Sequence, residues 1–404
     1  RRQRQMCIRD RFYTAPISTP TRAGLMTGRY PNRFGIRTTV IPPWREDGLD
    51  ENEETLADML ARNGYSNRAI IGKWHLGHTR KVHYPINRGF SHFYGHLNGA
   101  IDYFDHMREG ELDWHNDWET CYDKGYSTEL ITQEAVRCIN TYEKEGPFLL
   151  YVAYNAPHTP LQAQEKDIEL YCDDFGSLTP KEQKRVTYQA MVSCMDRGIG
   201  TIVDALKKKG IMDNTFLIFF SDNGPAGVPG SSSGKLRGRK FDEWDGGVRV
   251  PAVFYWKRAE SNYKNLSSQV TGFVDIVPTL KELVGDKNRP ERAYDGISIL
   301  PLLIGSTSCI DRNFYLGCGA VVNKDYKLIR KGRKPGLNLP QDFLVDYQTD
   351  PYEKKNASNG NEQIVRSLYQ VALKYDTITP CLPEIPYGKG REGFKAPVEW
   401  KVTR

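Results

Sequence analysis

The sequence predicts an α/β fold, in which a large, mixed but mostly parallel sheet is sandwiched by helices and followed by a small C-terminal α+β subdomain. Two features predict it. Short apolar runs alternate with segments that carry apolar residues at helical spacing, which indicates strand–helix–strand order. The chain also has 404 residues, of which 39% are hydrophobic and 26% charged, so it can bury a sizeable core.

The first predicted elements are a helix over residues 54–62, closed by Gly64, and a short buried strand over residues 69–71. Ser127 has the side chain of an N-cap and begins a predicted helix that runs to about residue 142. The later elements of the large domain are, in order, a strand at 148–154, a helix at 188–208 that stops at Gly210, and strands at 216–220 and 250–255.

The pattern changes after about residue 305, where the apolar runs become shorter. Residues 324–330 and 343–346 are predicted to be edge strands with turns, and residues 362–375 a helix. We therefore expect a large domain over residues 12–304 and a C-terminal subdomain over residues 305–404, with a short antiparallel sheet and a helix.

The first eleven residues have neither strand alternation nor helical periodicity, and no signal-peptide core. We expect residues 1–11 to be a non-native or disordered arm. They hold five arginines and one aspartate, which accounts for four of the six net positive charges. The near-neutral remainder argues against a nucleic-acid partner. No run of about 18 apolar residues occurs, so no membrane span is expected.

Polar residues follow three of the predicted strands, at the ends where open α/β sheets bind ligands. Lys73 and His75 suit an anion that exchanges protons, and alternation in an extended segment would put both on one side. Asp222 and Asn223 offer two oxygen ligands for Ca²⁺ or Mg²⁺. His158 lies between two prolines. Taken singly, these residues could be a solvated lysine, a packed histidine, a turn and a loop histidine; together they suggest one site.

The sequence predicts that Ser18 is the N-cap of a short helix that ends at Gly28. Helix N-termini attract anions, and Arg22 would lie one turn further along the same face. On its own, this segment is better interpreted as an ordinary capped helix.

The sequence predicts neither a zinc site nor a particular set of disulfides. The pairs His75 with His78 and His92 with His96 have the spacing of helical metal ligands, but no H-E-x-x-H motif accompanies them, so a zinc site is not predicted. The eight cysteines contain no C-x-x-C, and their spacing cannot pair them.

Four segments together resemble the type I, formylglycine-dependent sulfatases of the alkaline-phosphatase-like superfamily. Residues 18–29 resemble the family signature of Ser or Cys, x, Pro, x, Arg followed by Thr-Gly-Arg, and residues 72–77 match its G-K-W-H-L-G. Residues 236–249 resemble its late lysine motif, in an arylsulfatase B-like form, and residues 347–353 its D-P-x-E turn. The likeness runs from about residue 12 to about residue 375.

The resemblance implies the following chemistry. A sulfatase-maturating enzyme would oxidise Ser18 to formylglycine, whose hydrate is the nucleophile, because a plain serine hydroxyl is a poor one near neutral pH. Arg22 would stabilise the hydrate. His158 would protonate the leaving oxygen, and His75 would accept a proton as sulfate is released.

The resemblance also implies the binding groups. Lys73 and Lys240 would hold the sulfate oxygens. Asp222, Asn223 and residue 18 would ligate Ca²⁺, with Mg²⁺ as the alternative.

Two departures from the family pattern matter. Family members begin with a strand that ends in an Asp-Asp pair of metal ligands, and this sequence starts after it. The resemblance therefore implies an N-terminally truncated chain that binds Ca²⁺ weakly and hydrolyses little. A serine at position 18 marks the serine type, which suggests an anaerobic or facultative bacterium, unless an engineered Cys-to-Ser change put it there.

The expected function is hydrolysis of sulfate esters of a sulfated sugar or glycan, in the periplasm or after secretion. A phosphodiesterase or phosphonate hydrolase of the same superfamily and a non-catalytic glycan-binding relative remain alternatives. Lys73 and Lys240 stand where a second metal would lie in the phosphate enzymes, which favours sulfate. Asp102, Tyr103 and His106 are candidate contacts to the sugar.

Overall fold

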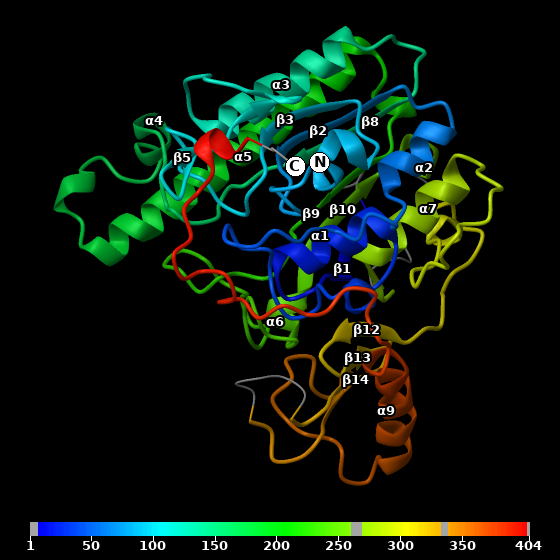
Figure 1. Ribbon diagram of the computed structural model, residues 1–404. Helices are drawn as coiled ribbons and strands as arrows, with labels where there is room; N and C mark the ends of the chain where they lie inside the picture. Colours follow the sequence, from blue (N-terminus) through cyan, green and yellow to red (C-terminus); the bar gives the residue numbers. More distant parts are fainter. Residues whose placement is uncertain (1–6, 260–268, 333–337, 402–404) are drawn as a thin grey trace. The chain divides into compact units, whose positions relative to one another are not determined.

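The structure, a computed structural model, describes residues 7–259, 269–332 and 338–401 (Figure 1). The chain forms two compact units. Unit 1 comprises residues 1–40, 213–226 and 232–385, and unit 2 comprises residues 41–212, 227–231 and 386–404. Both contain β-sheets and helices, as the predicted α/β class requires. No helix in the described parts is long and apolar enough to cross a membrane.

A four-stranded sheet forms the centre of unit 1, with the strand order β11-β1-β10-β9. Its strands are β1 (Cys7–Tyr13), β9 (Leu217–Phe220), β10 (Arg249–Tyr255) and β11 (Thr271–Gly272). Strand β10 is antiparallel to both neighbours, so β1 and β9 run in the same direction. The ends of β1 and β9 and the start of β10 therefore lie at one edge of the sheet.

Strand β1 corrects the expectation of a non-native or disordered arm over residues 1–11. Residues 7–11 belong to this strand, while residues 1–6 lie outside the described residues. The strand was not predicted from the sequence because charged residues interrupt its apolar pattern. The Arg11 guanidinium lies 4.2 Å from the Tyr347 ring centroid and donates to the Lys324 carbonyl, so the arginine is buried and partnered.

The helices of unit 1 outside its C-terminal sheet are α1 (Ser18–Thr27), α6 (Asp245–Val248), α7 (Ile276–Leu283) and α8 (Leu300–Leu303). Helix α1 packs against α7 and the 3₁₀ helix at Phe273–Asp275. Gly24 permits this packing, because a Cβ there would lie 2.1 Å from the Phe273 ring. The other 3₁₀ helices of the described chain are Pro31–Phe34, Lys81–His83, Pro85–Arg88, Phe175–Ser177, Met212–Asn214 and Val398–Trp400.

The C-terminal part of unit 1 is an antiparallel sheet covered by one helix, as predicted. Its strands follow chain order and are β12 (Phe314–Gly317), β13 (Ala320–Val322), β14 (Tyr326–Ile329) and β15 (Phe343–Asp346). Helix α9 (Glu362–Asp376) packs on β12, β13 and β14 (Figure 1). Its buried Leu368 and Ala372 belong to the core of this sheet.

A fully buried charge cluster joins this small sheet to the rest of unit 1. The Lys327 ammonium on β14 lies 2.9 Å from an Asp245 carboxylate oxygen and 2.7 Å from one of Glu353. The second Glu353 oxygen accepts the Asp245 amide hydrogen at 2.7 Å. The Tyr347 hydroxyl donates to Asp245 at 2.9 Å, and Arg237 donates to the Glu353 carbonyl at 2.7 Å. The cluster thus clamps residues 237–245 between strand β14 and the turn that contains Glu353.

Unit 2 contains most of the parallel strand pairing, although β1 and β11 of unit 1 also pair parallel. In its five-stranded sheet, of order β7-β6-β3-β2-β8, strand β2 is parallel to both β3 and β8. The strands of unit 2 are β2 (Asn67–Lys73), β3 (His92–His96), β6 (His115–Asn116), β7 (Glu119–Thr120) and β8 (Phe148–Ala153), with β4 (Met107–Arg108) and β5 (Glu111–Leu112) in a separate hairpin.

The predicted strands thus belong to two sheets. The predicted parallel pairing is found between β2 and its neighbours β3 and β8, whereas β9 and β10 pair antiparallel.

The helices of unit 2 are α2 (Leu56–Arg62), α3 (Ser127–Thr141), α4 (Glu165–Ile168) and α5 (Pro180–Lys209). Helix α5 begins eight residues before the predicted start. Thr179 caps it through a reciprocal pair of hydrogen bonds with Glu182, and Pro180 follows at the first helical position. Its first turns are polar and largely exposed, so they carry no apolar periodicity that a sequence reading could detect.

The last described residues do not follow the predicted division at residue 304. Residues 386–404 were expected in the C-terminal subdomain but group with unit 2. Trp400 explains this difference for the described part. Its ring is fully buried, packs edge-on against His78, and donates to the Arg108 carbonyl at 2.9 Å.

The buried cluster predicts a large stability effect of Lys327→Met. The change leaves Glu353 buried without its cation and Asp245 with only the Arg249 guanidinium, at 3.3 Å, and we expect it to lower the free energy of unfolding by about 3–5 kcal/mol. Lys355→Met, the same change on an exposed side chain, should stay within about 0.5 kcal/mol of the unsubstituted protein. Urea unfolding followed by tryptophan fluorescence measures both. An unchanged midpoint for Lys327→Met would show that the cluster does not hold this part of unit 1 together.

Candidate functional site

Ser18 is the first residue of helix α1, just beyond the end of β1. The predicted N-cap role is wrong, because the extended Ile17 occupies the cap position and makes no side-chain cap bond. Thr21 orders this turn instead. Its hydroxyl lies 3.1 Å from the Ala15 amide nitrogen and 3.2 Å from the Ile17 carbonyl oxygen. The Ser18 hydroxyl is thereby left to donate to the Asn223 side-chain oxygen at 3.3 Å.

Arg22 lies one turn along α1 and pairs with Asp222. Its guanidinium donates to the Asp222 carboxylate at 3.1 Å, and its side chain is only 7% exposed. Asp222 and Asn223 follow strand β9, whose end shares an edge with the end of β1. The sheet therefore brings residues 18–22 and 222–223 together, although about 200 residues separate them in the chain.

Lys240 is anchored to both of these segments by the backbone. The Lys240 amide donates to the Pro225 carbonyl at 2.9 Å, and the next amide, of Phe241, donates to the Pro16 carbonyl at 2.9 Å. Burial lowers the pKa of the Lys240 ammonium, an effect that Asp222 opposes and Arg22 adds to. Five of the predicted residues, Ser18, Arg22, Asp222, Asn223 and Lys240, thus belong to one edge of the unit 1 sheet.

The donor set at this edge fits a hard cation. Ser18 and Asn223 oxygens lie 3.3 Å apart, and the neighbouring Asp222 adds a carboxylate. Oxygen donors of this kind suit Ca²⁺ or Mg²⁺, whereas nitrogen and sulfur donors suit Zn²⁺. Ca²⁺ takes about six to eight oxygens, so these three residues would supply part of its shell.

Lys73 and His75 lie at the carboxyl end of β2 in unit 2, where both are buried. His75 has a φ of 63°, so the extended alternation expected for this pair does not set its direction. Its amide donates to the Leu97 carbonyl at 3.0 Å, and its ring packs on Gly99. A Cβ at Gly99 would lie 2.4 Å from that ring, so the close approach requires glycine.

His158 follows β8, whose register with β2 pairs Ala153 with Gly72. The carboxyl ends of these two parallel strands therefore coincide. The Nδ1 atom of His158 lies 2.7 Å from the Thr159 carbonyl oxygen. Since a carbonyl only accepts, Nδ1 carries the hydrogen, and Nε2 is the nitrogen that can exchange a proton. The joint role of Lys73, His75 and His158 with the five residues of unit 1 stays a prediction.

Each of the three candidate sugar contacts has partners within the protein. Tyr103 is fully buried and donates to the His158 carbonyl at 2.9 Å. His106 is 1% exposed, stacks on Trp114 and lies 3.0 Å from the Gly125 carbonyl oxygen. Asp102 accepts hydrogen bonds from the Gln162 side chain and from two amides of its own turn. They order the loop beside His158, which is a supporting role.

Asp113 is a positioning residue that the sequence reading missed. It is fully buried and accepts hydrogen bonds from the amides of Leu97 and Asn98, each at 2.9 Å, and from the Nε2 atom of His115 at 3.1 Å. It therefore orders the loop that packs on His75. It belongs to no motif, and its partners lie in separate stretches of sequence, so no local signal marks it.

Asn155 is a second missed residue, at the end of β8 beside His158. Its side-chain amide is buried, and neither its oxygen nor its nitrogen has a hydrogen-bond partner among the described residues. A buried polar group without a partner is costly, which makes a ligand contact here physically reasonable.

Comparison with known proteins gives one consistent result. A family model described as "Sulfatase" matches residues 1–286. Arylsulfatase J of Mus musculus is 34% identical over 300 residues, which cover 72% of this chain and 48% of that protein. N-acetylgalactosamine-6-sulfatase of Mus musculus is 32% identical over 318 residues, with 72% and 58% covered. The chain thus spans about half the length of these curated relatives.

Among solved structures, Ps i-CgsB in complex with k-i-k-neocarrahexaose superimposes with a TM-score of 0.80 at 28% identity. The match covers 94% of this chain and 87% of that one. It confirms the predicted fold class.

The role of Asp113 predicts an acid-dependent loss of stability. Burial alone would raise its pKa, but hydrogen bonds and charge from His115 hold the pKa well below its usual range. A carboxyl with a lowered folded-state pKa stabilises the fold above its unfolded pKa of about 4, and this contribution is lost as the pH falls. At pH 7, Asp113→Asn should cost about 1.5–3 kcal/mol, and the difference from the unsubstituted protein should shrink below pH of about 4. Asp105→Asn, at an exposed position, is the control. A pH-independent difference would contradict this assignment.

Proposed function

The chain belongs to the sulfatase family, and on that premise we propose that it hydrolyses sulfate esters of a sulfated saccharide at a formylglycine made from Ser18. The observation that carries the proposal is the group of side chains around Ser18. Arg22 and Lys240 provide positive charge, while Asp222 and Asn223 provide oxygen ligands, all at one sheet edge. Such a group suits a small tetrahedral anion.

The names of similar proteins support a saccharide as the substrate. One relative is an N-acetylgalactosamine-6-sulfatase, and Ps i-CgsB was solved with a carrahexaose. Because the chain spans about half of its curated relatives, the activity and the substrate class are both proposed here for the whole protein.

Formylglycine, once a maturating enzyme has made it, supplies a hydrated aldehyde as the nucleophile at position 18. Asp222, Asn223 and residue 18 would hold Ca²⁺, which would supply positive charge to a bound sulfate. Arg22, one turn along α1 and already paired with Asp222, stabilises negative charge at position 18. Lys240 neutralises charge that builds on sulfate as the ester bond breaks.

The groups of unit 2 complete the proposed reaction by moving protons. His158 donates its Nε2 proton to the oxygen of the leaving alcohol. His75 would accept a proton from position 18 when sulfate is released. Lys73 binds sulfate as a second cation. Two lysines rather than two metal ions favour a sulfate monoester over a phosphate ester.

The direct test is to co-express the whole protein with a serine-type maturating enzyme. Mass spectrometry should find the peptide with residue 18 two hydrogens lighter than its serine form, and the protein should hydrolyse 4-nitrophenyl sulfate faster than phosphate mono- or diesters. Ser18→Ala should abolish hydrolysis. A peptide that keeps serine when the protein is isolated from its native host, or faster phosphodiester hydrolysis, would refute the proposal.

Lys240 gives a matched mutational test. Lys240→Met should lower kcat by about 10²–10³, because it removes charge stabilisation of the developing anion. Lys235→Met, in the same segment but exposed, should leave kcat nearly unchanged. Steady-state kinetics on the matured protein measures both. Equal effects of the two changes would contradict the role of Lys240.

The proposed Ca²⁺ site predicts reversible inhibition by chelators. EDTA should abolish hydrolysis, and Ca²⁺ should restore it at lower concentration than Zn²⁺, because the ligands are hard oxygens. Asp222→Asn should raise the Ca²⁺ concentration needed for half-maximal activity. Full activity after exhaustive chelation would show that no metal is required.

A further inference from the structure

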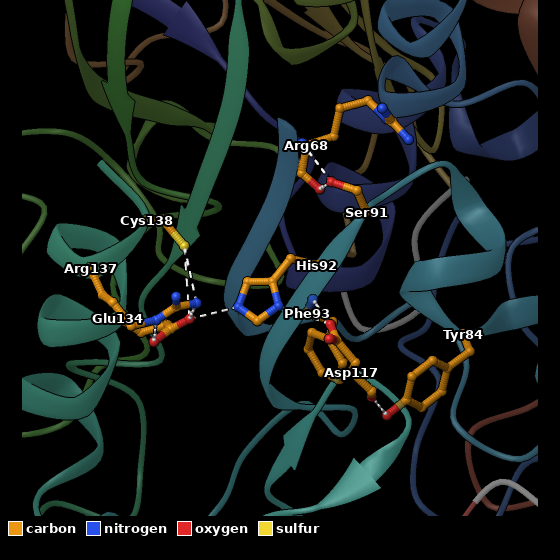
Figure 2. Close-up of polar contacts among 9 residues, drawn as sticks. All are labelled: Arg68, Tyr84, Ser91, His92, Phe93, Asp117, Glu134, Arg137 and Cys138. Carbon is orange, nitrogen blue, oxygen red and sulfur yellow. Dashed lines mark hydrogen bonds and ion pairs between the residues drawn. The ribbon is translucent and has the colours of Figure 1, made fainter. Parts of the chain in front are cut away.

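A cluster of three different metal-binding side chains lies in unit 2, on residues outside the proposed reaction. The Nε2 atom of His92, a carboxylate oxygen of Glu134 and the sulfur of Cys138 all lie within 4.8 Å of one another (Figure 2). His92 begins strand β3, whereas Glu134 and Cys138 are four residues apart on helix α3. That spacing puts both helical residues on one face, toward the strand.

The individual distances describe a compact group. The His92 Nε2 atom lies 2.6 Å from the Glu134 oxygen, and the Cys138 sulfur lies 3.8 Å from the same oxygen. The side chains of His92 and Glu134 are 17% and 12% exposed, and Cys138 is buried. The three ligand atoms are therefore largely shielded from water, which favours binding of a metal ion over free hydration of the ligands.

Asp117 supports the histidine from its other side. Its carboxylate lies 2.9 Å from His92 Nδ1 and also accepts the Phe93 amide hydrogen at 2.9 Å (Figure 2). Asp117 lies in the turn between β6 and β7. Its backbone carbonyl accepts a hydrogen bond from the Tyr84 hydroxyl at 2.6 Å. A carboxylate on the second nitrogen orients the ring and makes Nε2 a better ligand, the usual surrounding of metal-bound histidine.

Arg137 is the competing feature. Its guanidinium binds both Glu134 oxygens, at 2.8 and 2.5 Å, and lies 3.9 Å from the Cys138 sulfur. The Arg137 side chain is 55% exposed, so it can leave Glu134 without creating a buried, unpaired charge. An ion-pair network alone would explain His92, Glu134 and Arg137, but it gives no role to the buried thiol beside them.

We propose that His92, Glu134 and Cys138 form a binding site for a divalent ion of the Zn²⁺ class. A nitrogen, an oxygen and a sulfur donor select such an ion over Ca²⁺, and water would fill the fourth position. Binding displaces two protons, one from His92 Nε2 and one from the Cys138 thiol, because both atoms must offer a lone pair. The His92 and Glu134 ligand atoms separate from 2.6 Å to about 3.3 Å, as tetrahedral bonds of about 2.0 Å require. The ion would tie β3, α3 and the β6–β7 turn together.

The test uses Co²⁺ as a spectroscopic probe on the full chain, in a background where the exposed Cys309 and Cys381 are serine. Titration should produce one equivalent of thiolate-to-cobalt charge-transfer absorption in the near ultraviolet, and Zn²⁺ should abolish it. Cys138→Ser should remove the absorption. Cys194→Ser, which changes another buried cysteine of unit 2, should keep it. The oxygen ligands proposed around Ser18 contain no thiolate and cannot produce this signal, so the result does not depend on the sulfatase activity.

Two further variants separate a metal site from an ion-pair network. Asp117→Asn should weaken Co²⁺ binding by about 10–100-fold, because the histidine loses its orienting partner. Arg137→Gln should tighten binding severalfold, because it frees Glu134, whereas a purely structural ion pair predicts no gain from that change. Absence of the charge-transfer absorption in the background with Cys309→Ser and Cys381→Ser alone, or its survival after Cys138→Ser is added, overturns the proposal. Circular dichroism of each variant verifies that it is folded.

Discussion

The position of β10 between β1 and β9 is the constraint on which the unit 1 site depends. Both neighbours are antiparallel to β10, so their ends and its start must lie at one edge of the sheet. That edge receives Ser18 from the first strand, Asp222 and Asn223 from β9, and the Lys240 segment that leads into β10. Three stretches of chain thus meet through ordinary backbone pairing, before any contact between their side chains is made.

The buried Lys327 cluster adds a second constraint, because it holds the segment that carries Lys240. Asp245 and Glu353 share the lysine ammonium, and Glu353 also accepts the Asp245 amide hydrogen. A buried charge needs its partners to stay in place, so the cluster penalises any shift of residues 237–245. The family-like D-P-x-E turn therefore has a physical role within unit 1: it supplies Glu353, which fixes a segment of the site from the C-terminal sheet side.

The site residues were easiest to predict from the sequence where polar side chains directly follow a strand. The polar residues after β2, β8 and β9 stand at carboxyl strand ends, as predicted. Prediction was hardest where the deciding contact is distant. Strand β1 was not predicted, because the partners that allow Arg11 to be buried, Tyr347 and Lys324, lie more than 300 residues away in the sequence. Asp113 and the carboxylates around His92 could not be found for the same reason. Ser18 was misplaced by one position, because the hydroxyl of Thr21, rather than its own, orders the turn.

The central claim is that the edge shared by β1, β9 and β10 binds sulfate. A crystal structure of the full chain with Ca²⁺ and inorganic sulfate tests it most directly. We predict one sulfate within hydrogen-bonding distance of the Lys240 ammonium and next to residue 18, with Ca²⁺ on Asp222 and Asn223. Sulfate bound elsewhere, with this edge folded as described but holding neither ion, would contradict the account.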